Sequence, residues 1–156
     1  MKEQLGESVS AVNGKDGIIV HTVAKERLFE FMKEMKEKGF DSLSLITGVD
    51  RKDYLEVVYH LHNFATDEYV EVKTTTDNGV VPSLVSLWSS ARWDEREEYD
   101  LMGIKFEGHE NLKRIFLPEN WVGHPLRKDY NLKNIQYINM DKDGEDYATF
   151  DPGDGW

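Results

Sequence analysis

The sequence contains no cysteine among its 156 residues. Disulfides, zinc–thiolate sites and cysteine-ligated iron–sulfur clusters are therefore excluded, so any redox chemistry would belong to another protein. No apolar run approaches the ~20 residues that a membrane-spanning helix requires. The first ten residues also lack the basic and apolar regions of a secretion signal. These absences predict a soluble protein on the cytoplasmic side.

Basic residues are scarce as well. The sequence has 19 Lys and Arg against 30 Asp and Glu, which gives a net charge of −11. Binding to nucleic acid requires clustered basic residues with little acid nearby, so a nucleic-acid partner is not expected. A basic protein surface is the better complement. The length suits one domain that buries its own core without disulfides or metals.

The first half of the chain predicts a sheet and one helix. Residues 1–16 are expected to form a short helix or an irregular lead-in. An amphipathic helix is expected at Ala24–Lys38, where apolar residues recur at helical spacing and Gly39 follows as the stop. Strands are expected in the run that Gly17 opens and around residues 43–49, 55–61 and 70–72, where apolar and polar residues alternate. One face of the sheet is expected to be covered and the other partly wet.

Unusual residues concentrate between Trp93 and Tyr130. Asp94–Asp100 carries five acids and one arginine, whereas Lys105–Lys128 carries five bases and three acids. Two blocks of opposite charge separated by a short apolar run favour a fold-back in which one block pairs with the other. We expect a helix that begins at Pro82, a second helix capped by Ser89 or Ser90, short strands at 104–106 and 114–117, and then an ordered arm.

The expected helix after Ser90 carries charged residues on more than one side. Arg96 and Asp100 stand four residues apart and can pair, whereas Glu97 shares a side with Leu101 and is expected to face the core. A buried carboxylate requires a cationic or multiply hydrogen-bonded partner. The possible partners beyond Gly103 are His109, Lys113, Arg114, His124, Arg127 and Lys128. We expect Arg114 and one of the histidines to hold Glu97 and Asp100.

Three other interpretations of the residues stay open. Glu95, Glu97 and Glu98 could supply general acid and base groups in a free-standing enzyme, although acids at this spacing are common on helix surfaces. His60 and His62 point the same way from one strand and could bind a metal, although no third ligand accompanies them. Residues 139–144 match the first half of a calcium loop, but Phe150 stands where its essential glutamate should be.

The ordered pattern across residues 93–130 resembles the 30 kDa subunit of respiratory complex I, which is the C subunit of the bacterial NADH:quinone oxidoreductase. The resemblance extends over roughly residues 18–133 and includes the phrase LSLITGVD. It rests on Glu95-Arg96-Glu97 followed by Asp100, Gly103, Gly108-His109, Leu112–Arg114, and Trp121 through Tyr130. Glu110 departs from the family, which usually has proline there.

The resemblance implies an accessory structural subunit without a catalytic, cofactor or metal site of its own. FMN, iron–sulfur clusters and quinone would be bound by partner subunits. The chain would lie peripherally on the cytoplasmic side of the membrane and brace the 49 kDa-type subunit near the quinone site, with neighbouring iron–sulfur subunits as further partners. Related subunits occur in energy-converting hydrogenases and in deazaflavin- or ferredoxin-dependent dehydrogenases, which stand as the alternative.

The sequence therefore predicts an α+β domain at residues 1–130 and an acidic C-terminal extension at 131–156. Its sheet is expected to be four-stranded and mainly antiparallel, with helices on one face and an extended C-terminal arm. A structural network is predicted for Glu95, Arg96, Glu97, Asp100, His109 and Arg114. The predicted partner interface comprises Trp121, His124, Pro125, Arg127, Lys128, Asp129 and Tyr130.

Overall fold

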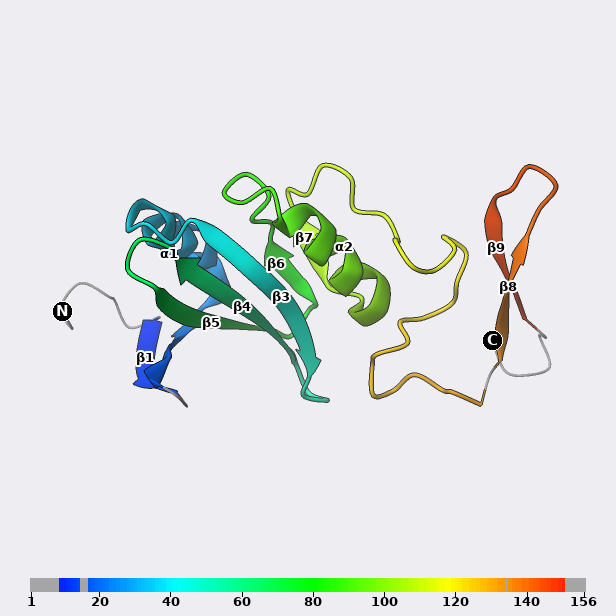
Figure 1. Cartoon of the computed structure of the whole chain (residues 1–156). Coiled ribbons are helices and arrows are strands. Elements are labelled where there is room, and N and C mark those ends of the chain that lie inside the picture. Colours follow the sequence, from blue (N-terminus) through cyan, green and yellow to red (C-terminus); the bar gives the residue numbers. More distant parts are fainter. Residues whose placement is uncertain (1–8, 15–16, 134, 151–156) are drawn as a thin grey trace.

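A computed structural model describes residues 9–14, 17–133 and 135–150 (Figure 1). Of the predicted lead-in at residues 1–16, residues 1–8 and 15–16 lie outside these ranges, and residues 9–13 form a strand instead. Within them, no helix is long and apolar enough to cross a membrane.

A five-stranded sheet forms the body of the molecule, in the order β1-β2-β5-β4-β3. The strands are β1 (Val9–Asn13), β2 (Ile19–Val23), β3 (Ser42–Asp50), β4 (Leu55–Asn63) and β5 (Glu68–Thr76). The predicted α+β class is confirmed, but the sheet has one strand more than predicted and is mixed, because β2 and β5 run parallel. Hairpin reasoning finds neighbours in sequence only, so it missed both this parallel pairing and the short strand β1.

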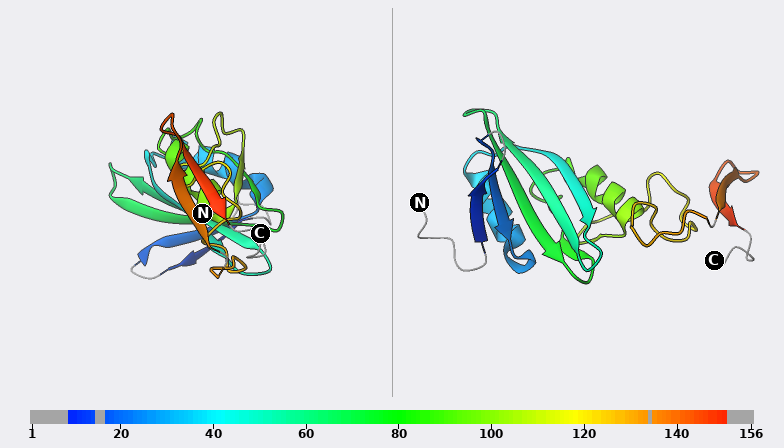
Figure 2. Two further views of the ribbon diagram at one scale, coloured as in Figure 1. Left: turned by 90° about the vertical axis from the view of Figure 1, so that its right-hand side faces the viewer. Right: turned by 90° about the horizontal axis from the view of Figure 1, so that it is seen from below.

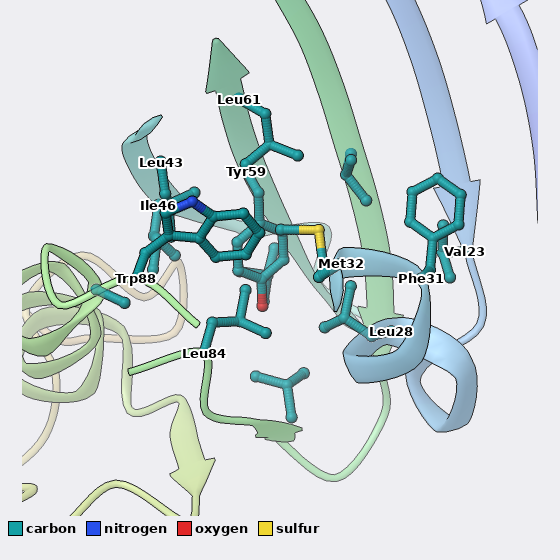
Figure 3. Close-up of a cluster of buried hydrophobic side chains, with 14 of the residues drawn as sticks. Val23, Leu28, Phe31, Met32, Leu43, Ile46, Tyr59, Leu61, Leu84 and Trp88 are labelled. Carbon is teal, nitrogen blue, oxygen red and sulfur yellow. The ribbon is translucent and has the colours of Figure 1, made fainter. Parts of the chain in front are cut away.

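Helix α1 (Lys25–Glu37) packs on one face of this sheet, as predicted. Leu28, Phe31 and Met32 are buried against the apolar face of the sheet, where Tyr59 and Leu61 are also buried (Figure 3). Met32 and Met35 are therefore part of the core. The helix ends where Gly39 adopts a φ of 94°, a conformation that glycine accepts without strain.

The predicted helix that begins at Pro82 was wrong. Val80–Pro82 is instead a short strand, β6, that pairs in parallel with β7 (Lys105–Glu107). The Glu95 carboxylate accepts the Leu84 N–H at 2.7 Å and the Ser83 hydroxyl at 2.6 Å. These bonds hold the backbone after Pro82 in a turn, so a helix cannot start there.

Helix α2 (Ala91–Met102) confirms the second predicted helix and lies on the same face as α1, next to β3 (Figure 1). Ser90 stands at its N-cap position but makes no side-chain cap, because its hydroxyl donates to Leu43 O at 2.9 Å. Gly103 ends the helix in the left-handed conformation, with a φ of 73°.

Beyond β7 the chain leaves the sheet as residues 108–130, which we call the arm, and continues into a hairpin of β8 (Gln136–Met140) and β9 (Asp146–Phe150). The hairpin lies apart from the main sheet (Figures 1 and 2). The predicted strand at residues 114–117 was wrong, because the N–H groups of Ile115, Phe116 and Leu117 converge on one carboxylate oxygen of Asp100. Such convergence bends the backbone and leaves no ladder of hydrogen bonds.

Close packing of α2 on β3 predicts that Gly48→Ala destabilises the protein by about 1–3 kcal/mol, the usual cost of overpacking. A Cβ at this position would lie 2.5 Å from Glu98 Oε2 and 2.7 Å from Ile104 Cδ1. Urea denaturation of the full chain measures the loss. Adding Ile104→Val removes Cδ1 and should restore part of the stability, and a Gly48→Ala protein as stable as the wild type would show that the contact relaxes freely.

Candidate functional site

The buried face of α2 is made largely of carboxylates. Glu95 and Asp100 are fully buried and Glu98 is 8% exposed. Glu97 is exposed, so the prediction that it faces the core was wrong. The error is one of helical phase, because the stripe that faces inward is carried by Ala91, Glu95, Glu98 and Met102, and a search for apolar residues does not select two glutamates.

Asp100 joins the end of α2 to the arm. Its Oδ1 accepts Arg114 Nη1 at 2.7 Å, and its Oδ2 accepts three backbone N–H groups at 2.8–3.0 Å. Burial raises the pKa of Asp100, but the hydrogen bonds from Arg114 and the three N–H groups outweigh burial and hold the pKa below its usual value. The carboxylate is therefore fully satisfied and ionised at neutral pH.

Arg114 extends this network along the arm. Its Nη1 also donates to Asp100 O at 2.9 Å, and its Nη2 donates to Trp121 O and Gly123 O, each at 3.0 Å. One guanidinium thus fixes three separate points of the backbone. Removing the guanidinium would break all three of these attachments at once.

Arg96 acts on the same segment, but it does not pair with Asp100 as the spacing suggested. Its Nε donates to Lys113 O at 3.0 Å and its Nη2 to Arg114 O at 2.9 Å, while the guanidinium lies 5.2 Å from the centre of the Trp93 ring. Arg96 bonds to backbone carbonyl groups of the arm, and Arg114 pairs with Asp100 in its place. The sequence could not predict this, because a side-chain pattern does not show where backbone carbonyl groups lie.

Both histidines of this stretch bond to backbone. His109 Nδ1 accepts the Asn111 N–H at 3.0 Å, so its Nε2 carries the proton and donates to Arg92 O at 3.0 Å. His124 Nδ1 donates to Asp100 O at 2.9 Å, and its ring lies where a side chain at Gly103 would be, 2.6 Å from a Cβ placed there. Neither ring is placed as a catalytic base, because each already spans two segments of the fold.

Asp50 holds the far end of the arm, and sequence reasoning missed it. Its Oδ2 accepts the Lys128 N–H at 2.9 Å and lies 3.4 Å from Arg127 Nε, and its Oδ1 accepts the Lys52 N–H at 2.7 Å. The Lys128 N–H is the largest cause of a lowered pKa for Asp50. The only signal in sequence was an aspartate at the end of an otherwise uncharged strand, within LSLITGVD.

The predicted partner interface is more buried than expected. Trp121, His124, Pro125, Arg127 and Tyr130 are half-buried within the arm, whereas Lys128 and Asp129 are exposed. The exposed large apolar side chains of the arm are Phe116, Val122 and Leu126, at 57%, 37% and 59% exposure. No pattern marked them in advance, because their exposure depends on the path of the arm backbone, which Asp100, Arg114 and Asp50 hold.

Glu95 and Glu98 both have a pKa well above the ordinary value for glutamate, and burial is the main cause at both. It raises the pKa of Glu95 to about 7, against the opposing effects of the Ser83 and Leu84 donors. It also raises the pKa of Glu98 to about 7, against the opposing effect of the Gly48 N–H. Within the described residues, Glu98 Oε2 and the buried Tyr59 hydroxyl have no hydrogen-bond partner.

Raised pKa values alone do not make these glutamates an active site. Two open hollows of about 370 and 240 Å³ lie elsewhere, one beside Trp88 and the other beside Asp50, and neither is lined by Glu95, Glu97 or Glu98. Glu95 is fully buried, so a substrate has no access to it. The free-standing enzyme that would use this cluster has no support in the geometry.

The two metal hypotheses fare no better in the part of the chain that the structure describes, where no group of three or more potential ligands could hold an ion. His62 stacks on Tyr69 and lies 3.1 Å from Asp67, while His60 faces Glu71 at 3.8 Å. In the supposed calcium loop, Asp141 Oδ1 accepts the N–H groups of Asp143 and Glu145 and so closes the β8–β9 turn.

Residues 21–136 match a family model described as the 30 kDa subunit of respiratory-chain NADH dehydrogenase. The chain belongs to this family. The resemblance drawn from the residues between Trp93 and Tyr130 is therefore confirmed, and the network of Asp100, Arg114 and Arg96 lies inside the matched range.

Members of the 30 kDa subunit family are similar to this chain along most of its length. The C subunit of the NADH-quinone oxidoreductase of Moorella thermoacetica is 46% identical over 116 residues, which cover 71% of this chain and 78% of that protein. The C subunit of the Chlorobium phaeobacteroides enzyme is 33% identical, with 88% of each chain covered. A protein of Phocaeicola vulgatus named as a C/D subunit is 39% identical over 78% of this chain, which spans 27% of that protein.

Two solved structures share the fold. A trypsin-resistant fragment of Nqo5 matches with a TM-score of 0.63 and 30% identity, over 67% of this chain and 89% of the fragment. A chain of the membrane-bound sulfane sulfur reductase, an archaeal respiratory membrane complex, matches with a TM-score of 0.73 and 25% identity, over 88% of this chain and 91% of that chain. The second match extends over more of this chain than the first.

Proposed function

We propose that this protein is an accessory structural subunit of a complex I-type, ion-translocating NADH:quinone oxidoreductase. It would sit peripherally on the cytoplasmic side of the membrane, with no active site of its own, and would brace the 49 kDa-type D subunit near the quinone site. One observation carries this proposal. The backbone of the arm is fixed by Asp50, Asp100 and Arg114, while Phe116, Val122 and Leu126 face solvent.

Fixing a backbone while leaving large apolar side chains exposed is useful for binding, because the partner then loses little free energy to ordering the arm. Of the predicted network, Arg96, Asp100, His109 and Arg114 would supply this rigidity, with Asp100 and Arg114 at its centre. Glu95 bonds to Ser83 and Leu84 instead, and Glu97 is exposed. Trp121, His124, Pro125, Arg127 and Tyr130 would shape the arm from within. Lys128 and Asp129 would meet the partner directly.

The β8–β9 hairpin extends the same surface. Isolated two-stranded hairpins are marginal in water, and this one exposes Tyr137, Ile138 and Met140 at 50–69%. It is fastened to the arm by two side-chain amides. Asn120 bonds both Ala148 N and O at 2.8–2.9 Å, and Gln136 bonds both Val122 N and O at 2.9 Å. We assign the exposed apolar side chains to contact with the D-type subunit.

Relatives named as C/D subunits support this partner, because a single chain there carries both names. The sequence has no cysteine, which agrees with FMN, iron–sulfur clusters and quinone being bound by partner subunits. The neighbouring iron–sulfur subunits of the complex would be further contacts of this chain.

The match to the sulfane sulfur reductase chain favours a second candidate, the equivalent subunit of another energy-converting membrane complex. A membrane-bound hydrogenase or a deazaflavin- or ferredoxin-dependent dehydrogenase would use such a subunit in the same way. Identifying the subunits that co-purify with this chain from native membranes distinguishes these assemblies.

Leu126→Glu tests the proposed arm surface. The substitution should lower the amount of D-type subunit retained by the affinity-tagged chain at least tenfold, because a charge would be buried without a partner at an apolar contact. Quinone reductase activity of the membranes should fall with it. The isolated chain should keep its stability, since the Leu126 side chain is exposed and only its N–H bonds to Leu101 O.

Leu45→Glu is the matched control, because Leu45 is 43% exposed on β3, away from the arm. It should leave retention of the D-type subunit unchanged. Normal assembly and activity with Leu126→Glu would remove the arm from the interface.

A further inference from the structure

The main sheet has two outer edges, β3 at one end and β1 at the other. An edge strand carries N–H and C=O groups that have no partner strand, and folded proteins usually cover or block such groups. In this sheet the β3 edge is covered, whereas the β1 edge is exposed.

Side chains of α2 close the β3 edge. The Ser90 hydroxyl donates to Leu43 O, the Ile46 N–H lies against the Asp94 carboxylate, and the Gly48 N–H lies against the Glu98 carboxylate. Four helical residues rise about 6 Å, and two residues of a strand rise about 6.6 Å. The side chains at positions 90, 94 and 98 are therefore spaced to reach successive backbone groups along β3. They bond to groups that a sixth strand would otherwise pair with.

The β1 edge has no such cover among the residues that the structure describes. All four residues from Ser10 to Asn13 are exposed, and Val12 is 60% exposed. The strand, VSAVN, holds no charge and no proline, and its pairing with β2 runs without a bulge. It also lies at the end of the sheet away from α2 and the arm (Figure 1). Apart from its short length of five residues, β1 carries none of the usual devices that prevent edge pairing.

The pairing with β2 fixes which groups of β1 point outward. Gly14 N donates to Ile18 O at 2.7 Å, so the pair above it, Asn13 with Ile19, does not exchange hydrogen bonds. Hydrogen-bonded and non-hydrogen-bonded pairs alternate along an antiparallel ladder, so the N–H and C=O groups of Val12 and Ser10 bond to β2. Ala11 and Asn13 direct their N–H and C=O groups away from the sheet.

The geometry points to β1 as the docking edge for a strand from a further protein, an extended and uncharged segment of another subunit of the same assembly. A second copy of this chain is the poorer occupant. Two five-residue strands paired alone bury far less than the roughly 1,200 Å² that stable interfaces begin at. A subunit already held in the assembly by other contacts needs only the added backbone hydrogen bonds, and main-chain hydrogen bonds are what supply affinity in strand addition.

This inference rests on the proposed membership of a multisubunit assembly, but it does not depend on what the arm binds. Its test is hydrogen exchange of the Ala11 and Asn13 amides, compared between the purified native complex and the full chain alone. The complex should slow both amides at least tenfold, while the exposed turn amide of Asp53 should change little. Equal exchange in the two samples overturns the proposal. Protection that appears in the free chain, at low or high concentration, also overturns it, because residues of the same chain or of a second copy would then cover the edge.

Ala11→Pro provides the matched variant, with Ala11→Val as its control. Proline removes the outward N–H of residue 11 and leaves the bonds of Ser10 and Val12 to β2 in place, whereas valine changes only the side chain. In the complex, Ala11→Pro should abolish the protection of the Asn13 amide and Ala11→Val should retain it. Retained protection in Ala11→Pro contradicts strand addition. If Ala11→Pro fails to fold, the wild-type comparison still decides, and retention of the D-type subunit reports separately on the arm.

Discussion

Replacing Asp100 with asparagine should lower the free energy of unfolding of the full chain by about 3–5 kcal/mol, the range for breaking a buried ion pair at one partner. Asp100 is fully buried and Arg114 is 9% exposed, so the guanidinium would lose its counter-charge with little water to replace it. The asparagine NH2 would also face donors in either orientation, the Arg114 guanidinium at the Oδ1 position or the three backbone N–H groups at the Oδ2 position. Urea denaturation followed by circular dichroism measures the loss.

Asp53→Asn is the control for this substitution, because it removes the same charge from an exposed residue. Its effect should stay within about 0.5 kcal/mol. Since the folded-state pKa of Asp100 lies below its ordinary value of 3.8, its contribution is present above that pH and is lost as the pH falls through the folded-state pKa. The gap between wild type and Asp100→Asn should therefore narrow in acid. A loss below 1 kcal/mol at neutral pH would mean that the arm holds without this carboxylate.

Glu98→Gln should make the protein less sensitive to pH between 4.5 and 7. The pKa of Glu98 is about 7 in the folded protein against an ordinary value of 4.5, so in this window the folded state binds a proton that the unfolded state releases. Stability must then fall as the pH rises, by about 1.4 kcal/mol per pH unit for one such group. Glu95 contributes in the same direction and over the same window.

A series of urea denaturations between pH 4.5 and 7 should show this slope in the wild type and a slope smaller by about 1.4 kcal/mol per unit in Glu98→Gln. Glutamine keeps an oxygen toward the Gly48 N–H, so the fold is preserved. Glu97→Gln is the control, because this residue is exposed one position away on the same helix. An unchanged slope in Glu98→Gln would show that Glu98 is already ionised at pH 4.5 to 7.

Helices and strands of this fold could be predicted from the sequence where a single local pattern determines them. Helix α1 and the β3–β4–β5 meander follow apolar periodicity and short polar links, and both were predicted. The parallel pairing of β2 with β5 was not, because it brings together residues 51 positions apart, such as Ile19 and Val70, with no turn to signal it. Strand β1 escaped because five residues with two valines form too weak a pattern.

The site divides in the same way. The composition and order of residues 93–130 were enough to identify the segment and its family. The positions of individual charges were not, because they depend on backbone groups: Arg96 turned to carbonyl oxygens of the arm, and Ser83 and Leu84 supplied donors for Glu95. Sequence patterns describe side chains, and most partners in this network are main-chain atoms.

That reliance on main-chain atoms has an evolutionary consequence. The guanidinium groups of Arg96 and Arg114 hold peptide carbonyls at residues 100, 113, 114, 121 and 123, which exist whatever side chains those positions bear. The path of the arm is thus encoded separately from the chemistry on its outside. Phe116, Val122 and Leu126 can be exchanged as a neighbouring protein diverges, while the polypeptide trace that presents them is inherited unaltered.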